Sequence, residues 1–163
     1  MTIQIDSREH KWEMARIQRQ LTAVGCKTIV SKLYVGDYQS LDNPRLVVDR
    51  KKDLLELCGN VCQQHERFRR ELLRAMDAGI QIIILVEHGS DITRLEDVFF
   101  WDNPRLKESP KATTGESLYR SLLTIRDKYN VRFEFCTKKE TGKRIMELLE
   151  HGEEEGKRMD KAL

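Results

Sequence analysis

The sequence feature that most constrains the fold is an uninterrupted apolar run at residues 81–87, Gln-Ile-Ile-Ile-Leu-Val-Glu. A run without polar alternation predicts a β-strand that is buried on both faces, as in the central sheets of α/β proteins. The run is far shorter than the roughly 20 apolar residues that a membrane-spanning helix needs, so it predicts no membrane segment. Helices must therefore cover both faces of the sheet that contains this strand.

The rest of the sequence predicts the elements that such a fold requires. Strands are predicted at residues 2–6, 27–33, 38–41, 46–49 and 131–136, and the Asp-Asn-Pro turn makes 38–49 a hairpin. Helical spacing of apolar residues predicts helices at 11–24, 51–78 (with a break near Gly59-Asn60), 113–129 and 137–152. This alternation predicts an α/β fold with a mixed central sheet flanked by helices on both faces.

Length and composition favour one intracellular domain. The chain has 163 residues, of which 34% are charged, and its first residues lack the basic and apolar regions of a secretory signal. We expect a cytoplasmic protein that makes no membrane contact and whose four cysteines are free thiols. We also expect a folded domain at residues 1–152 and a charged, disordered tail at residues 153–163.

Two segments leave alternatives open. Residues 88–113 are irregular and are either an ordered surface loop or a mobile flap, and Trp101 is interpreted there as an anchor of the core or loop rather than a base-stacking residue. Cys58, Cys62 and His65 have helical spacing, but no fourth ligand is evident, so ordinary packing is favoured over a zinc site.

Two carboxylates and one lysine form the main candidate site. Asp37 follows a glycine, Asp49 comes twelve residues later at the end of an apolar run, and Lys51 is two residues further on. In a strand, Asp49 and Lys51 point to the same face and Arg50 points to the other. Carboxylates can hold Mg²⁺, which activates water, and a lysine can orient that water or balance charge on a phosphate. The pattern indicates phosphodiester cleavage; the alternative is a set of strand-end acids facing solvent.

Further charged residues extend this candidate site. Asp6 ends the first strand and can reach the same edge, Glu9 can act as a base or orienting group, and Glu87 is interpreted as a surface charge. Residues 50–74 carry seven basic and four acidic residues, a net charge of +3 in a chain of net charge +2. Arg67, Arg70 and Arg74 form a helical stripe opposite Phe68, Leu72 and Met76. Both phosphate contact and a plain solvated face fit this stripe.

Four short motifs occur in an order that resembles a known family: I-D-S-R-E at 5–9, V-G-D-Y at 35–38, V-V-D-R-K at 47–51 and R-F-R-R-E-L at 67–72. Over residues 1–150 the chain resembles the nuclease domain of the XPF family of structure-specific endonucleases, within the PD-(D/E)XK superfamily. The resemblance implies a restriction-endonuclease-like fold. It also implies site roles by position: Asp6, Asp37 and Asp49 as catalytic metal ligands, Lys51 as the catalytic lysine, and Arg8, Glu9 and Arg50 as supporting residues.

The sequence departs from the family pattern at two positions. Asp49 stands where the family has Glu, and Leu55 stands where the family motif closes with Asp, so Asp53 or Glu56 is a candidate substitute. The family's usual helix-hairpin-helix and helicase-like domains are not expected in this chain, so DNA binding requires a homodimer or a separate DNA-binding partner.

The resemblance implies Mg²⁺-dependent cleavage of branched DNA, such as flaps and forks, with Mn²⁺ able to substitute. A Holliday-junction resolvase is the alternative within the same enzyme class. A catalytically inactive DNA-binding or dimerisation module is the alternative of another class, but degenerate relatives lose their acids. Asp6, Asp37, Asp49 and Lys51 are all present here, which favours an active enzyme.

Overall fold

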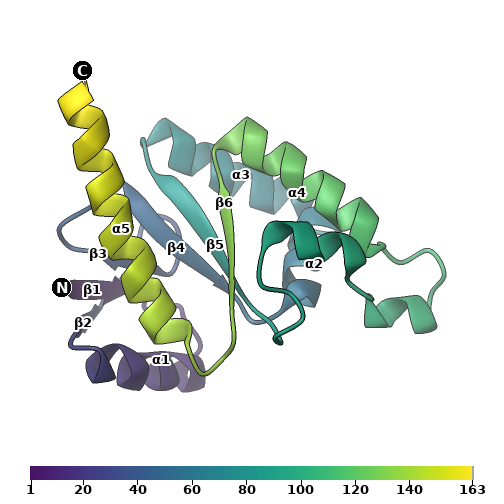
Figure 1. Ribbon diagram of the computed structural model, residues 1–163, viewed down its shortest axis with the longest axis horizontal. Coiled ribbons are helices and arrows are strands. Elements are labelled where there is room, and N and C mark those ends of the chain that lie inside the picture. Colours follow the sequence, from purple (N-terminus) through teal and green to yellow (C-terminus); the bar gives the residue numbers. More distant parts are fainter. Residues whose placement is uncertain (163) are drawn as a thin grey trace.

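The structure of the protein is a computed structural model that describes the backbone of residues 1–162 and side chains through residue 152. Six strands form one sheet in the order β2-β1-β3-β4-β5-β6 (Figure 1). The strands are β1 Thr2–Ile5, β2 Lys27–Val30, β3 Tyr38–Ser40, β4 Leu46–Lys51, β5 Gln81–Glu87 and β6 Arg132–Cys136. The helices are α1 Lys11–Ala23, α2 Leu54–Cys62, α3 His65–Asp77, α4 Gly115–Tyr129 and α5 Thr141–Ala162, with 3-10 helices η1 Leu95–Phe100 and η2 Pro104–Lys107.

The sheet is mixed, as the sequence predicts. β3 pairs antiparallel with both β1 and β4, so β3 and β4 form the predicted hairpin. β1 pairs parallel with β2, and β5 pairs parallel with both β4 and β6. The apolar run forms β5, which lies between β4 and β6 and is buried at every position except its first. The predicted α/β, restriction-endonuclease-like sheet is confirmed.

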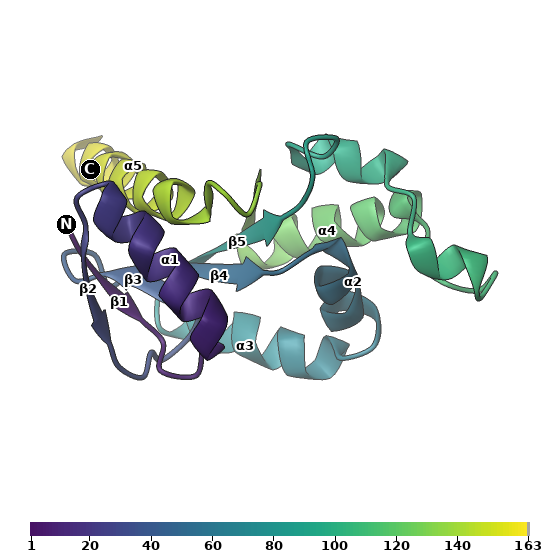
Figure 2. The same cartoon turned by 90° about the horizontal axis from the view of Figure 1, so that it is seen from below.

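Alternate residues of the central strands enter two separate cores. On one face Val47, Ile82 and Ile84 pack with α2, α3, α4 and η1. On the other face Val48, Ile83 and Leu85 pack with α1 and α5, and Figure 2 shows these two helices together on that side of the sheet. Adjacent residues of one strand therefore serve opposite faces, which decides where each charged residue at the strand end points.

Residues 88–113 form a loop that contains η1 and η2, and the choice between a fixed loop and a mobile flap stays a prediction. Trp101 is 8% exposed and belongs to the core on the α4 side of the sheet, so its interpretation as an anchor is confirmed. The four cysteines are free thiols. Within residues 1–162, no helix is long and apolar enough to cross a membrane.

Three predicted details of the helices are wrong. The break in residues 51–78 lies at Gln63-Gln64, because the N–H of Gln63 still bonds to the carbonyl of Gly59 and extends α2. In α3, Met76 is 45% exposed and Ala75 is buried in its place. The last helix does not end near Gly152 but runs to Ala162, through a segment rich in the helix formers Glu, Lys and Arg.

The predicted division into a domain at 1–152 and a disordered tail at 153–163 stays a prediction. The side chains of that tail, like Leu163 as a whole, lie outside the described residues.

Candidate active site

A polar pocket of about 790 Å³ opens beside the ends of β3 and β4, against α3. All of the residues predicted for the site line it: Asp6, Arg8, Glu9, Asp37, Asp49, Arg50, Lys51, Arg67, Arg70 and Arg74. Gly36, Glu56 and Glu71 complete the lining. The fold thus brings together residues that lie up to 68 positions apart in the sequence.

The β3–β4 hairpin fixes the positions of Asp37 and Asp49. The backbone N–H of Asp37 bonds to the carbonyl of Val48, and the N–H of Arg50 donates to Oδ2 of Asp37 at 2.8 Å. Lys51 Nζ lies 3.0 Å from Oδ2 of Asp49, whereas the guanidinium of Arg50 bonds to Glu9. Asp49 and Lys51 therefore share one face of β4 and Arg50 points to the other, as strand alternation predicts.

Gly36 allows the chain to turn tightly into Asp37. Its φ of +72° is a left-handed conformation, and a Cβ there would lie 2.9 Å from Cγ2 of Val47. Gly25 has a similar φ of +85°, but nothing lies within 4 Å of its added Cβ. The two glycines therefore differ in crowding and not in backbone conformation.

We expect Gly36→Ala to destabilise the protein more than Gly25→Ala. The control carries only the conformational cost of about 1–2 kcal/mol, while Gly36→Ala adds the contact with Val47 and displaces Asp37. Urea unfolding of both variants measures the difference. Equal losses of unfolding free energy would show that Val47 moves away from the added methyl group without destabilising the protein.

The carboxyl groups of Asp37 and Asp49 lie close enough for a hydrogen bond, which forms only while one of them is protonated. Burial, the charge of Asp49 and this hydrogen bond raise the pKa of Asp37 well above its ordinary value of 3.8, although the N–H of Arg50 acts in the opposite direction. Two carboxylates this close repel each other when both are ionised. A divalent cation relieves such repulsion, and Mg²⁺ is usually held by only one or two carboxylates together with water. The pair fits that donor set.

Asp6 lies in the same pocket but is engaged by other groups. Arg8 Nη2 is 2.8 Å from its Oδ2, and the backbone N–H of Leu33 donates to its Oδ1 at 3.4 Å. Within the described residues, no group of three or more His, Cys, Asp or Glu side chains is arranged to hold a metal ion. The fit therefore rests on the pair Asp37 and Asp49, and the role of Asp6 as a metal ligand stays a prediction.

The pocket also contains an acid that lies within the R-F-R-R-E-L motif but has no role in the predicted site. Glu71 of α3 has a raised pKa, because it is buried and faces the charge of Asp49; Lys51, the Gly36 N–H and Arg74 partly offset this. Burial lowers the pKa of Lys51. The nearby charges of Asp49, Asp37 and Glu56 outweigh this effect, so the pKa of Lys51 is raised overall. Glu71 is four residues after Arg67 and three before Arg74, so the helical stripe itself predicts its direction.

Neither candidate substitute for the family acid at Leu55 is a free carboxylate. Asp53 caps α2 by accepting the N–H of Glu56 at 2.8 Å, and Glu56 accepts the N–H of Lys52 at 2.8 Å. Asp53 is thus the N-cap of α2, while Glu56 accepts the N–H of the residue before the cap and so does not complete a capping box. Both acids serve the start of α2, although Glu56 also borders the pocket.

Behind the pocket lies a buried charge network. The guanidinium of Arg50 donates to both carboxylate oxygens of Glu9 at 3.1 and 3.2 Å, and its Nη1 lies 3.4 Å from Glu87. Tyr38 donates to Glu9, while Arg16 and the hydroxyl of Thr141 donate to Glu87 at 2.6 and 2.9 Å.

The interpretation of Glu87 as a surface charge is wrong. Glu87 is 1% exposed, because it continues the face of β5 that α1 and α5 cover, and Arg16 and Arg50 compensate its charge there. The acid at the end of the apolar run thus belongs to the interior of the protein.

We expect Asp37→Asn to stabilise the protein when metal is absent. The raised pKa of Asp37 means that the folded state binds more protons than the unfolded state above pH 3.8, so folding stability falls as the pH rises through that window. Asparagine removes this loss and keeps an acceptor for the N–H of Arg50. In EDTA, the advantage of Asp37→Asn in urea unfolding should grow from pH 4 toward neutrality.

Asp42→Asn, at an exposed turn position, is the control and should show no such trend. Added Mg²⁺ should stabilise the wild type and not Asp37→Asn, since a ligand stabilises the state that binds it. If the stability of the wild type changes with pH in the same way as that of Asp37→Asn, the raised pKa assigned to Asp37 is contradicted.

Comparison with known proteins agrees with the fold and the motifs. The sheet topology is of the restriction-endonuclease-like class. Residues 5–148 match the ERCC4 domain, so the chain belongs to the ERCC4 domain family. The resemblance to the XPF nuclease domain is thereby confirmed.

Two solved structures show the same fold at low sequence identity. XPF from Aeropyrum pernix superposes with a TM-score of 0.67 at 20% identity, covering 93% of this chain and 65% of that one. XPF from Aeropyrum pernix in complex with DNA gives a TM-score of 0.66 at 19% identity, covering 94% and 65%. The chain thus spans slightly less than two thirds of these proteins. A search of curated proteins found no match.

Proposed function

We propose that this protein is a divalent-metal-dependent endonuclease that cleaves branched DNA at flaps or forks. The observation that carries the proposal is the convergence of Asp37, Asp49 and Lys51 in one pocket of an ERCC4-domain chain. The solved relative that was captured in complex with DNA supports DNA as the substrate. Because Asp37, Asp49 and Lys51 are all present, an active enzyme is favoured over an inactive binding module.

Each group of the pocket has a distinct part in such a reaction. Asp37 and Asp49 would hold Mg²⁺, or Mn²⁺ in its place. A bound cation of this kind supplies a water of lowered pKa and positive charge for the phosphate. Lys51, held by Asp49 at 3.0 Å, adds a positive charge for the pentavalent phosphorus. Arg67, Arg70 and Arg74 of α3 line the pocket, where they would contact the flanking backbone phosphates.

A cleavage assay on matched oligonucleotides tests this proposal. Flap, fork, four-way-junction and linear duplex DNA of the same sequence are incubated with Mg²⁺, with Mn²⁺ or with EDTA. We expect cuts near the branch in flaps and forks with either metal, little cutting of linear duplex, and no cutting in EDTA. Symmetric paired nicks in the junction would instead identify a Holliday-junction resolvase. DNA binding without cleavage under any of these metals would identify a binding module.

A separate measurement addresses the assembly of the enzyme. A homodimer or a separate DNA-binding partner is proposed, and light scattering of the protein with and without DNA distinguishes the two. A stable dimer alone supports the homodimer.

A further inference from the structure

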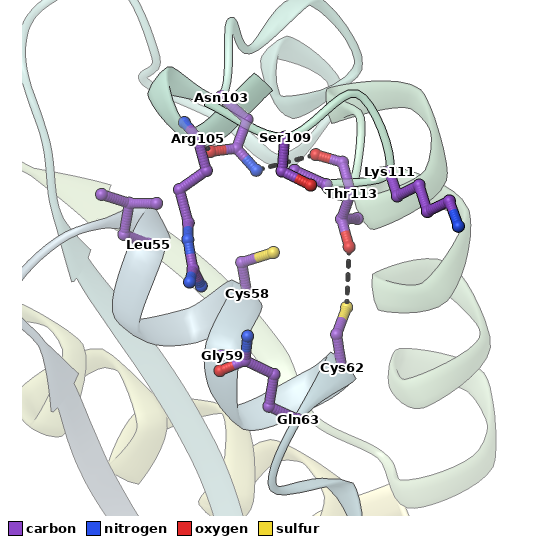
Figure 3. A pocket seen from close by; sticks show the side chains of 11 residues that line it. Leu55, Cys58, Gly59, Cys62, Gln63, Asn103, Arg105, Ser109, Lys111 and Thr113 are labelled. Atoms are coloured by element: carbon purple, nitrogen blue, oxygen red, sulfur yellow. Dashed lines mark hydrogen bonds between the residues drawn. The ribbon is translucent and has the colours of Figure 1, made fainter. Parts of the chain in front are cut away.

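A second pocket, of about 260 Å³, lies between α2 and the loop of residues 103–113 (Figure 3). Leu55, Cys58, Gly59 and Cys62 form its wall on α2. The opposite wall comes from the loop, and Figure 3 shows the guanidinium of Arg105 reaching from the loop toward α2. Pockets that enclose whole small ligands are usually about 300–1,000 Å³, so this one is suited to a single chemical group.

The loop that forms the outer wall is held in a fixed shape. Asn103 is 1% exposed; its Nδ2 donates to the carbonyl of Thr113 at 2.8 Å, and its Oδ1 accepts the N–H of Arg105 at 3.0 Å. The hydroxyl of Thr113 donates to the sulfur of Cys62, which ties the loop to α2. A pocket built from such a pinned loop is organised before any ligand arrives.

The charge of this pocket has one sign. Arg105 and Lys111 line it, and no acidic residue does. In the part of the chain whose side chains are described, no ion pair involves either cation, whereas Arg8, Arg16, Arg50 and Lys51 are all paired with acids. Ser109 adds a hydroxyl group beside the two cations, whereas the hydroxyl of Thr113 already donates to Cys62. Uncompensated positive charge with hydroxyl donors is the chemistry that binds a phosphate group.

Helix α2 separates this pocket from the candidate active site. The faces of α2 are distinct, because residues 55, 58, 59 and 62 line the basic pocket while Glu56 and Asn60 line hollows that continue to Lys51 and Arg67. Gly59 lies on the side of α2 between the two sets of residues. A Cβ added there would have only Oε1 of Gln63 nearby, at 4.0 Å. A helix with side chains is about 10–12 Å across, which sets the separation of the two pockets.

We propose that the basic pocket binds a backbone phosphate of the same DNA whose scissile phosphate enters the active pocket. The DNA then straddles α2, with one phosphate on each side of the helix. The width of α2 matches the major groove of B-DNA, which is about 12 Å wide and admits a helix. This inference rests on the proposed function, because it takes DNA to be the substrate of the neighbouring pocket.

Salt-dependent DNA binding tests the proposal without requiring cleavage. The affinity of wild type, Arg105→Ala/Lys111→Ala and Arg19→Ala/Lys27→Ala for one forked DNA is measured by fluorescence anisotropy in EDTA over a range of NaCl. Both double variants lose two exposed cations, but Arg19 and Lys27 lie on α1 and the edge strand β2, at the far side of the sheet. Long-range attraction is therefore weakened equally in both.

We expect Arg105→Ala/Lys111→Ala to bind DNA about 3–10-fold more weakly than the control, with a slope of log Kd against log salt smaller by about one. Equal affinities and slopes for the two double variants would overturn the proposal. A second result would also overturn it: wild type binds inorganic phosphate, Arg105→Ala/Lys111→Ala does not, and yet this variant binds DNA as tightly as the control. That result would identify a free phosphate or nucleotide as the ligand.

The failure of this inference differs from the failure of the proposed function. Wild type that binds DNA through the basic pocket but never cuts it contradicts only the nuclease. Wild type that cuts DNA while both double variants bind equally contradicts only the basic pocket.

Discussion

Asp49→Ala is expected to lower the rate of DNA cleavage by about 10²–10³-fold or more. The substitution removes half of the carboxylate pair proposed to hold the metal. It also leaves Lys51, which lies 3.0 Å from Asp49, without its nearest acid. DNA affinity measured in EDTA should not fall below that of wild type, since the carboxylate that is removed repels phosphate. Single-turnover cleavage of a forked substrate measures the rate.

Two further variants make this result specific. Asp49→Glu keeps the carboxylate that the family carries at this position and should retain measurable cleavage. Asp42→Ala removes an exposed acid from the turn before β4 and should cut at the wild-type rate. Cleavage by Asp49→Ala at the rate of Asp42→Ala would refute the assignment of the active pocket.

Arg50→Met is expected to lower the free energy of unfolding by about 3–5 kcal/mol. Methionine fills similar space without charge, so Glu9 loses its bidentate partner and Glu87 loses one of two cations. Both carboxylates are buried, and an uncompensated buried charge is far more costly than the loss of a surface pair. Urea unfolding at neutral pH measures the change.

A surface pair and a compensating change provide the controls. Arg126→Met removes an exposed partner of Asp127 and should cost less than about 1 kcal/mol. Adding Glu9→Gln to Arg50→Met removes the stranded charge and should recover part of the lost stability. A loss for Arg50→Met no larger than that for Arg126→Met would mean that water or rearrangement already compensates Glu9.

The sequence predicts the sheet and most of the pocket because local patterns determine them. The apolar run predicts that β5 is an interior strand, and the Asp-Asn-Pro turn defines the hairpin that brings Asp37 to Asp49. Strand alternation then separates Asp49 and Lys51 from Arg50. Each of these inferences uses neighbours within about a dozen residues.

The missed features depend on contacts between distant segments. Glu87 is buried because Arg16 and Thr141, 71 and 54 residues away, meet it across the face that α1 and α5 cover. Glu71 enters the pocket because α3, which packs on β5, carries it toward Asp49; the helical spacing indicates its side of the helix but not this neighbour. In α3, the small side chain of Ala75 is buried against the core, whereas the larger side chain of Met76 is 45% exposed.

The contact between Thr141 and Glu87 has a consequence for the order in which the protein assembles during synthesis. The acid at the end of β5 and the apolar residues Ile83 and Leu85 are covered by α5, which follows every other element of this domain in the sequence. Domains fold as units once their sequence is available, so a nascent chain that stops before residue 141 exposes this face of the sheet. Products truncated before α5 should then lack an organised pocket, and DNA-cutting activity should emerge only after α5 has been synthesised.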